Sequence, residues 1–142
     1  MKRFVLIFLI FNISIFASLV ETQKDIYKTI LYAIFPQKNT IKIWVDDKKL
    51  ANLLNHMKRV KIIDEYNKAD ILILKNRDDI DPKDKRIFVD GYRMFKKYKN
   101  VALGGFYWQK GRPNVILLKK NLNRFAITLP KSFETFIEDE EF

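Results

Sequence analysis

The sequence lacks cysteine and has few glycines, prolines and histidines, and each scarcity excludes a class of protein. Its 142 residues include four glycines, four prolines and one histidine. Without cysteine the chain has no disulfides, no zinc site built on thiolates and no thiol nucleophile. The glycine and proline contents are too low for a collagen-like or low-complexity chain, and a hydrophobic share of 48% is too high for a disordered one. We therefore expect one packed domain.

Side chains that could carry out acid–base or nucleophilic catalysis are also scarce. Beyond residue 18 the chain has one histidine, His56, and one serine, Ser132. His56 has no second imidazole with which to share a metal ion, and the pattern places it at the surface near the end of a helix. Ser132 precedes Glu134 by two residues, which is typical of a helix cap rather than a nucleophile. A hydrolase built on these two residues has no supporting motif, so we expect a protein that is not an enzyme.

Metal and cofactor motifs are absent as well. The dense acidic cluster of the body comprises Asp78, Asp79, Asp81 and Asp84. It lacks the glycine and the distal glutamate of a calcium loop, and basic residues crowd it. Gly104 and Gly105 lie inside a strand pattern without a following helix, so they do not form a phosphate loop. We expect no metal ion and no cofactor.

The N-terminus has the pattern of an export signal. Lys2 and Arg3 precede an apolar run over residues 4–16, and Ala17 and Ser18 follow it. This order is typical of a secretory signal peptide, with cleavage expected after Ala17 or Ser18. The alternative is an uncleaved membrane anchor, since residues 4–20 are just long enough to span a bilayer. No cysteine follows the run, which excludes a lipoprotein. The body, residues 19–142, is expected in the periplasm.

The net charge of +10 is divided unevenly along the chain. Residues 19–133 carry 25 basic and 12 acidic residues, a net +13, whereas the last nine residues include five acids. An anionic partner is indicated, but nucleic acid is not expected outside the cytoplasm. The basic residues are spread along the body rather than gathered in one run, which favours a solvated surface.

Alternating strand and helix patterns predict a three-layer α/β domain with a mixed, mostly parallel sheet that ends in a hairpin. Helical spacing follows a Thr22–Asp25 capping pattern, and it recurs after an Asp46–Asp47 cap. Strand patterns occur at 41–45, 60–63, 69–74, 87–89, 101–108 and 114–118, and helical patterns at 22–34, 50–57, 92–98 and 120–125.

Three consecutive aromatic residues precede the hairpin turn. Phe106 and Trp108 are expected on one face of their strand and Tyr107 on the other. If the hairpin lies at a sheet edge, one of these faces is open, and aromatic residues with Arg112 are typical anchors of protein interfaces, so these four are the candidate partner-binding residues. The alternative is that helices cover both faces. A structural role in the hairpin and its turn is expected for four further residues: Gly104, Gly105, Gly111 and Pro113.

The stretch 104–137 resembles the C-terminal half of the YfiR-like family of periplasmic regulators. The resemblance rests on the Gly104–Gly105 pair, the Gly111–Arg112 turn, the apolar strand that follows and the pattern over 127–133. Residues 68–74 and 22–35 are similar to the central strand and opening helix of that family. Leu118 stands where the family usually has asparagine, and the cysteines of many members are absent, which excludes a thiol-dependent input.

The resemblance implies a small α/β protein that binds the outward-facing sensor part of an inner-membrane diguanylate cyclase and holds the cyclase inactive. An exported, non-enzymatic regulatory binding protein is therefore the first hypothesis, with a homodimer as one form it could take. The alternative is a periplasmic solute- or wall-binding protein that recognises an anionic ligand.

Overall fold

The computed structural model describes residues 19–82 and 84–139. The predicted export signal, residues 1–18, lies outside these residues, as does the end of the acidic tail. Across the described part of the chain, no helix combines the length and the apolar character needed to cross a membrane.

The described residues form one sheet of seven strands in the order β2-β1-β3-β4-β5-β6-β7. β1 to β5 are parallel, β6 is antiparallel to β5, and β7 is parallel to β6. The mixed, mostly parallel sheet with a C-terminal hairpin is therefore confirmed. The strands are β1 Ile41–Val45, β2 Val60–Ile62, β3 Ile71–Leu74, β4 Ile87–Asp90, β5 Gly104–Gln109, β6 Arg112–Leu118 and β7 Ile137–Glu138.

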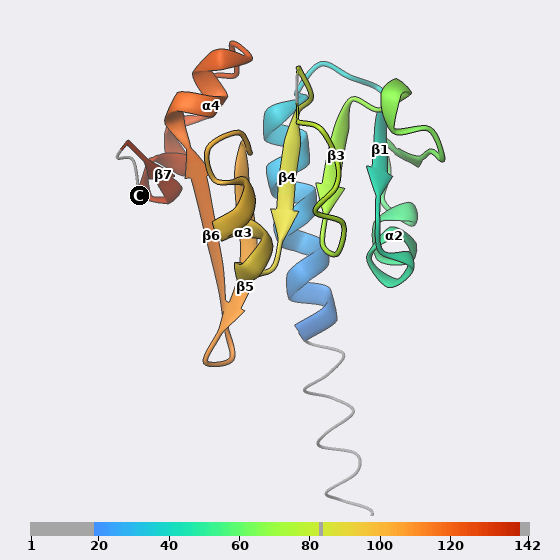
Figure 1. Ribbon diagram of the computed structural model, residues 1–142, viewed down its shortest axis with the longest axis horizontal. Helices are drawn as coiled ribbons and strands as arrows, with labels where there is room; N and C mark the ends of the chain where they lie inside the picture. The colour runs from blue at the N-terminus through green and yellow to red at the C-terminus, as the bar shows by residue number, and fades with distance from the viewer. Residues whose placement is uncertain (1–18, 83, 140–142) are drawn as a thin grey trace, which may run out of the picture.

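Helices cover both faces of the sheet, which confirms the three-layer domain (Figure 1). The N-terminal helix, residues 19–34, packs behind the sheet in this view, and α3 lies in front of it. The remaining helices are α2 Lys48–Asn55, α3 Tyr92–Tyr98 and α4 Lys119–Arg124, with the 3₁₀ turns η1 Tyr66–Lys68 and η2 Lys131–Phe136.

Two hydrophobic clusters fill the spaces between the layers. The larger joins the N-terminal helix and α2 to one face of the sheet, with Tyr27, Leu54 and Phe106 among its buried members. The smaller joins α3 to the opposite face through Met94 and Phe95. Within residues 19–82 and 84–139, the members of both clusters lie between residues 26 and 137.

The hairpin turn consists of Lys110 and Gly111, both with positive φ (51° and 75°). Two central residues with positive φ form the turn that suits strand twist best, and glycine adopts it without strain. Pro113 lies within β6, opposite Trp108. Because Gln109 and Arg112 close the turn, the nitrogen of Pro113 points away from β5, where a ladder bond is not required.

Gly104 and Gly105 have a packing role rather than a turn role. Both lie inside β5. A Cβ on Gly104 would approach the carbonyl oxygen of Ile116 to 2.4 Å, and a Cβ on Gly105 would come within 2.9 Å of the side chains of Phe95 and Val89. The glycine pair therefore lets β6 and α3 approach β5 closely.

Two local expectations were wrong, and one strand was missed. Thr22 lies inside the N-terminal helix, which is already formed at residue 19, so it does not cap the start. Ser132 lies inside η2, whose N-cap is Pro130. β7 was not anticipated, because a strand of two residues is too short to show an alternating pattern.

Candidate functional site at the carboxyl edge of the sheet

The strand order reverses between β1 and β3. The chain continues from β1 to β2 on one side, while β3, β4 and β5 follow on the other. In open α/β sheets, ligands bind in the crevice outside the carboxyl ends of the strands at such a switch point. A ligand site is therefore expected at the carboxyl ends of β1, β3 and β4.

A groove of about 650 Å³ opens at this edge, between the start of the N-terminal helix, α2 and the β5–β6 hairpin. We call it the carboxyl-edge groove. Its apolar wall includes Leu19 and Trp108, which remain 40% and 38% exposed. Lys49 and Lys75 add positive charge. The complete lining is Leu19, Val20, Gln23, Lys49, Leu50, Asn52, Leu53, Lys75, Trp108 and Gly111.

A buried carboxyl group lies beneath the groove. Asp90, the last residue of β4, is only 6% exposed. It accepts a hydrogen bond of 2.5 Å from the Tyr27 hydroxyl and one of 3.3 Å from the side-chain amide of Gln23, which lines the groove. Burial raises the pKa of Asp90, although the Tyr27 bond and the charge of Lys75 oppose the rise. Burial, with the charge of Asp90, also raises the pKa of Tyr27.

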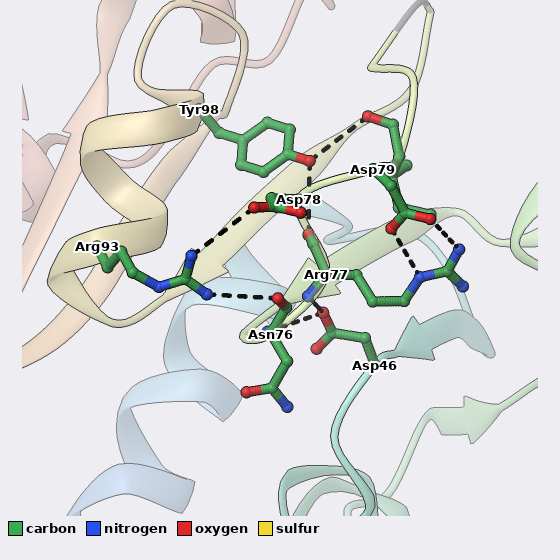
Figure 2. Close-up of polar contacts among 8 residues, drawn as sticks. Asp46, Asn76, Arg77, Asp78, Asp79, Arg93 and Tyr98 are labelled. Atoms are coloured by element: carbon green, nitrogen blue, oxygen red, sulfur yellow. Dashed lines mark hydrogen bonds and ion pairs between the residues drawn. The ribbon is translucent and has the colours of Figure 1, made fainter.

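The rest of the switch point is closed by Asp46, which follows β1. One carboxylate oxygen accepts the backbone N–H of Lys75 at 2.7 Å, and the other accepts those of Asn76 and Arg77 at 2.9 and 2.6 Å. Figure 2 shows Asp46 against the backbone of the segment that follows β3. A carboxylate of the chain itself therefore occupies these N–H donors, and this half of the crevice is not available to an external anion.

The Asp46–Asp47 pair was predicted to cap the helix that follows, and Asp47 is the N-cap of α2. Its carboxylate accepts the backbone N–H of Leu50 at 3.0 Å and the side-chain amide of Asn76 at 3.2 Å. Partial burial opposes ionisation, but these hydrogen bonds outweigh it and lower the pKa of Asp47. The Asp46–Asp47 pair thus serves structure rather than catalysis.

The acidic loop between β3 and β4 is fixed to the body on the far face. Arg77 and Asp79 form a two-bond pair at 3.0 Å. Arg93 of α3 lies 3.8 Å from Asp78, and the Tyr98 hydroxyl donates to loop carbonyls at 3.5 Å (Figure 2). Within residues 19–82 and 84–139, no group of three or more acidic or histidine side chains could hold a metal ion. Asp78 and Asp79 pair with Arg93 and Arg77.

The structure separates the four candidate partner-binding residues. Phe106 is fully buried against Tyr27, with ring centroids 5.8 Å apart, so it belongs to the core and is withdrawn as a surface contact. Trp108 shares its face, as expected, and lines the groove. Tyr107 faces the other way, against Tyr92 with centroids 5.3 Å apart. Arg112 is exposed beside the turn.

His56 and Ser132 are both exposed and do not line the groove. His56 is the C-cap of α2. Sequence reasoning missed Lys49 and Lys75 as groove residues and Asp90 as the buried carboxyl group beneath the groove. Lys75 and Asp90 each come directly after an apolar run with a strand pattern. A polar residue at the carboxyl end of such a strand is the sequence signal that could have predicted both residues at the site.

The fold defines a single-domain α/β protein with a carboxyl-edge groove. No family model matches the chain, and no curated protein is similar to it. Among solved structures, it is similar to the crystal structure of a conserved domain protein from Vibrio cholerae O1 biovar El Tor str. N16961. The TM-score is 0.59 at 8% sequence identity over 80% of this chain, and the match spans 58% of the Vibrio chain. At this identity the similarity concerns the fold alone.

Proposed function

We propose that the protein is an exported, non-enzymatic binding protein that regulates a membrane signalling protein, and that its partner binds in the carboxyl-edge groove. The observation that carries the proposal is the exposure of Trp108 and Leu19 on a groove at the switch point of the sheet. Exposed apolar side chains at a hollow usually mark binding sites, and tryptophan is enriched among the residues that dominate binding energy.

The partner class follows from the resemblance to YfiR-like regulators, which implies the periplasmic sensor domain of an inner-membrane diguanylate cyclase. Lys49 and Lys75 favour a partner segment that combines apolar and acidic residues, because unlike charges at a rim speed association and select the partner. Because the chain has no cysteine, such regulation would be independent of thiols.

The test is a calorimetric titration of residues 19–142 with the isolated sensor domains of membrane diguanylate cyclases from the same organism. We expect one sensor domain to bind. The double variant K49E/K75E should then weaken binding at least about tenfold, since it replaces attraction with repulsion at the rim. The matched control K58E/K61E changes the net charge equally at exposed lysines outside the groove and should change the affinity little.

Failure of every sensor domain to bind would contradict the proposed partner class. Equal losses in the two double variants would contradict the groove as the binding site, because they would show a dependence on net charge alone.

A second candidate, a periplasmic protein that binds an anionic solute, is favoured by the size of the groove. About 650 Å³ lies within the usual range of small-molecule pockets. A thermal-shift screen of carboxylates, phosphate esters and muropeptides distinguishes the two candidates. A bound solute raises the melting temperature with its concentration, whereas a protein that binds only a sensor domain shows no such rise.

A further inference from the structure

Cationic and apolar side chains gather at one end of the domain. Gly111 of the hairpin tip lines the groove together with Leu19 and Trp108, so the tip and the start of the N-terminal helix are neighbours. Figure 1 shows this helix start and the hairpin tip at the same end of the molecule. Lys110 and Arg112 flank Gly111 and are exposed. We call this surface the hairpin end.

The acidic groups near this surface largely have partners already. Asp46 accepts three backbone N–H groups, and Asp47 caps α2. Glu21 is an exposed acid in the first turns of the N-terminal helix. The donors to Asp46 and Asp47 are uncharged N–H groups, so these two acids keep their charge. The hairpin tip itself, residues 109–113, has Lys110 and Arg112 and no acid, so the tip is basic.

The sequence also connects the hairpin end to an apolar segment. Only residues 17 and 18 separate Leu19 from the run over residues 4–16. That run is expected to enter the membrane as a signal peptide or as a retained anchor, and Leu19 at the hairpin end is the first described residue after it. Exposed tryptophan and basic side chains are the residues that favour the headgroup region of a bilayer.

We propose that the hairpin end docks on a bilayer that contains anionic phospholipid. Trp108 and Leu19 lie at the level of the headgroups, and Lys49, Lys110 and Arg112 face the phosphates. Basic residues near an anionic leaflet are attracted to it, so three such residues with two apolar side chains support reversible binding. This docking goes beyond the proposed function. Because Trp108, Leu19 and Lys49 also line the groove, docking on the bilayer and binding of a protein partner in the groove would exclude each other.

The experiment measures co-sedimentation of residues 19–142 with vesicles of phosphatidylglycerol and phosphatidylcholine, and with vesicles of phosphatidylcholine alone. We expect binding to the anionic vesicles only, and weaker binding as salt is added. The variant K110E/R112E should bind at least about tenfold more weakly, because each reversal removes an attraction and adds a repulsion. The control K58E/K61E alters net charge equally but lies outside the hairpin end, and it should stay within about twofold of the wild type.

Circular dichroism and thermal melting establish that each variant is folded. Equal binding to both kinds of vesicle, no binding to either, or equal losses in the two double variants would each overturn the proposal. The vesicles contain no protein partner, so failure to bind them does not contradict the proposed sensor-domain partner. Failure of the sensor-domain titration likewise does not contradict binding to the bilayer.

Discussion

Asp46 holds the segment after β3 in place through three backbone N–H groups, and it does so from the end of a different strand. We predict that Asp46→Ala lowers the free energy of unfolding by about 1–3 kcal/mol, because donors near the groove lose a charged acceptor. Urea denaturation followed by circular dichroism measures the change. Asp79→Ala, which removes an exposed ion pair, is the control and should lower the stability much less than Asp46→Ala, because solvent screens exposed pairs. A loss in Asp46→Ala no larger than in this control would contradict the role of Asp46.

Asp90 gives the unfolding free energy a pH dependence of known sign. Burial raises its pKa above the ordinary value of 3.8. The folded state therefore keeps a proton that the unfolded state has already lost, so the contribution of Asp90 is fully present below pH 3.8 and falls as pH rises through the raised pKa.

We expect Asp90→Asn to remove this dependence. Urea denaturation at a series of pH values should show wild type losing stability relative to the variant as pH increases across that window, with no further change above it. A difference between the two proteins that is constant with pH, or that has the opposite slope, would show that Asp90 is not perturbed by burial.

At the scale of single residues, the sequence showed which side chains are available but not which of them meet. A helix cap at the Asp46–Asp47 pair could be predicted because the cap and its helix are adjacent in sequence, and the structure shows that Asp47 is the cap. The approach of Gln23 and Tyr27 to Asp90 depends on how the N-terminal helix crosses the sheet, and no local pattern contains that information.

Among the elements, β5 packs closely against its neighbours because Gly104 and Gly105 have no side chains. We predict that Gly105→Ala lowers the free energy of unfolding by about 1–3 kcal/mol, because the new methyl group would overlap Phe95 of α3 and Val89 of β4. Thermal or urea denaturation measures the loss. Adding Phe95→Leu should recover part of it by making room, so the double variant should be more stable than the two single effects added together. Strict additivity would show that the methyl group does not meet Phe95.

Most elements were predictable from sequence because each has a local signature. The buried run of β3, the capped helix α2 and the alternation of Phe106, Tyr107 and Trp108 are short-range patterns. The burial of individual side chains was harder to predict from the sequence. Alternation placed Phe106 and Trp108 on one face, but only the covering helix decides that Phe106 is in the core and Trp108 on the groove.

For the whole molecule, the strand order creates the candidate site. The groove lies where the strand order reverses: β1 and β3 are neighbours, and the chain continues from β1 to β2 on one side and from β3 to β4 on the other. The hairpin and the N-terminal helix form its walls. Composition indicated an anionic partner through a strongly basic body. The fold brings Lys49 and Lys75 to the one edge where exposed Trp108 also lies.

The most direct test of the proposed function compares the sensor-domain affinities of two aromatic truncations. Trp108 and Tyr66 are equally exposed, at 38%, and each packs on one neighbouring ring, Phe106 or Trp44. Only Trp108 lines the groove. We predict that Trp108→Ala raises the Kd at least about tenfold, as expected at an interface hot spot, whereas Tyr66→Ala leaves it within about twofold. A Kd unchanged by Trp108→Ala, or raised equally by both substitutions, would contradict the groove as the place where the partner binds.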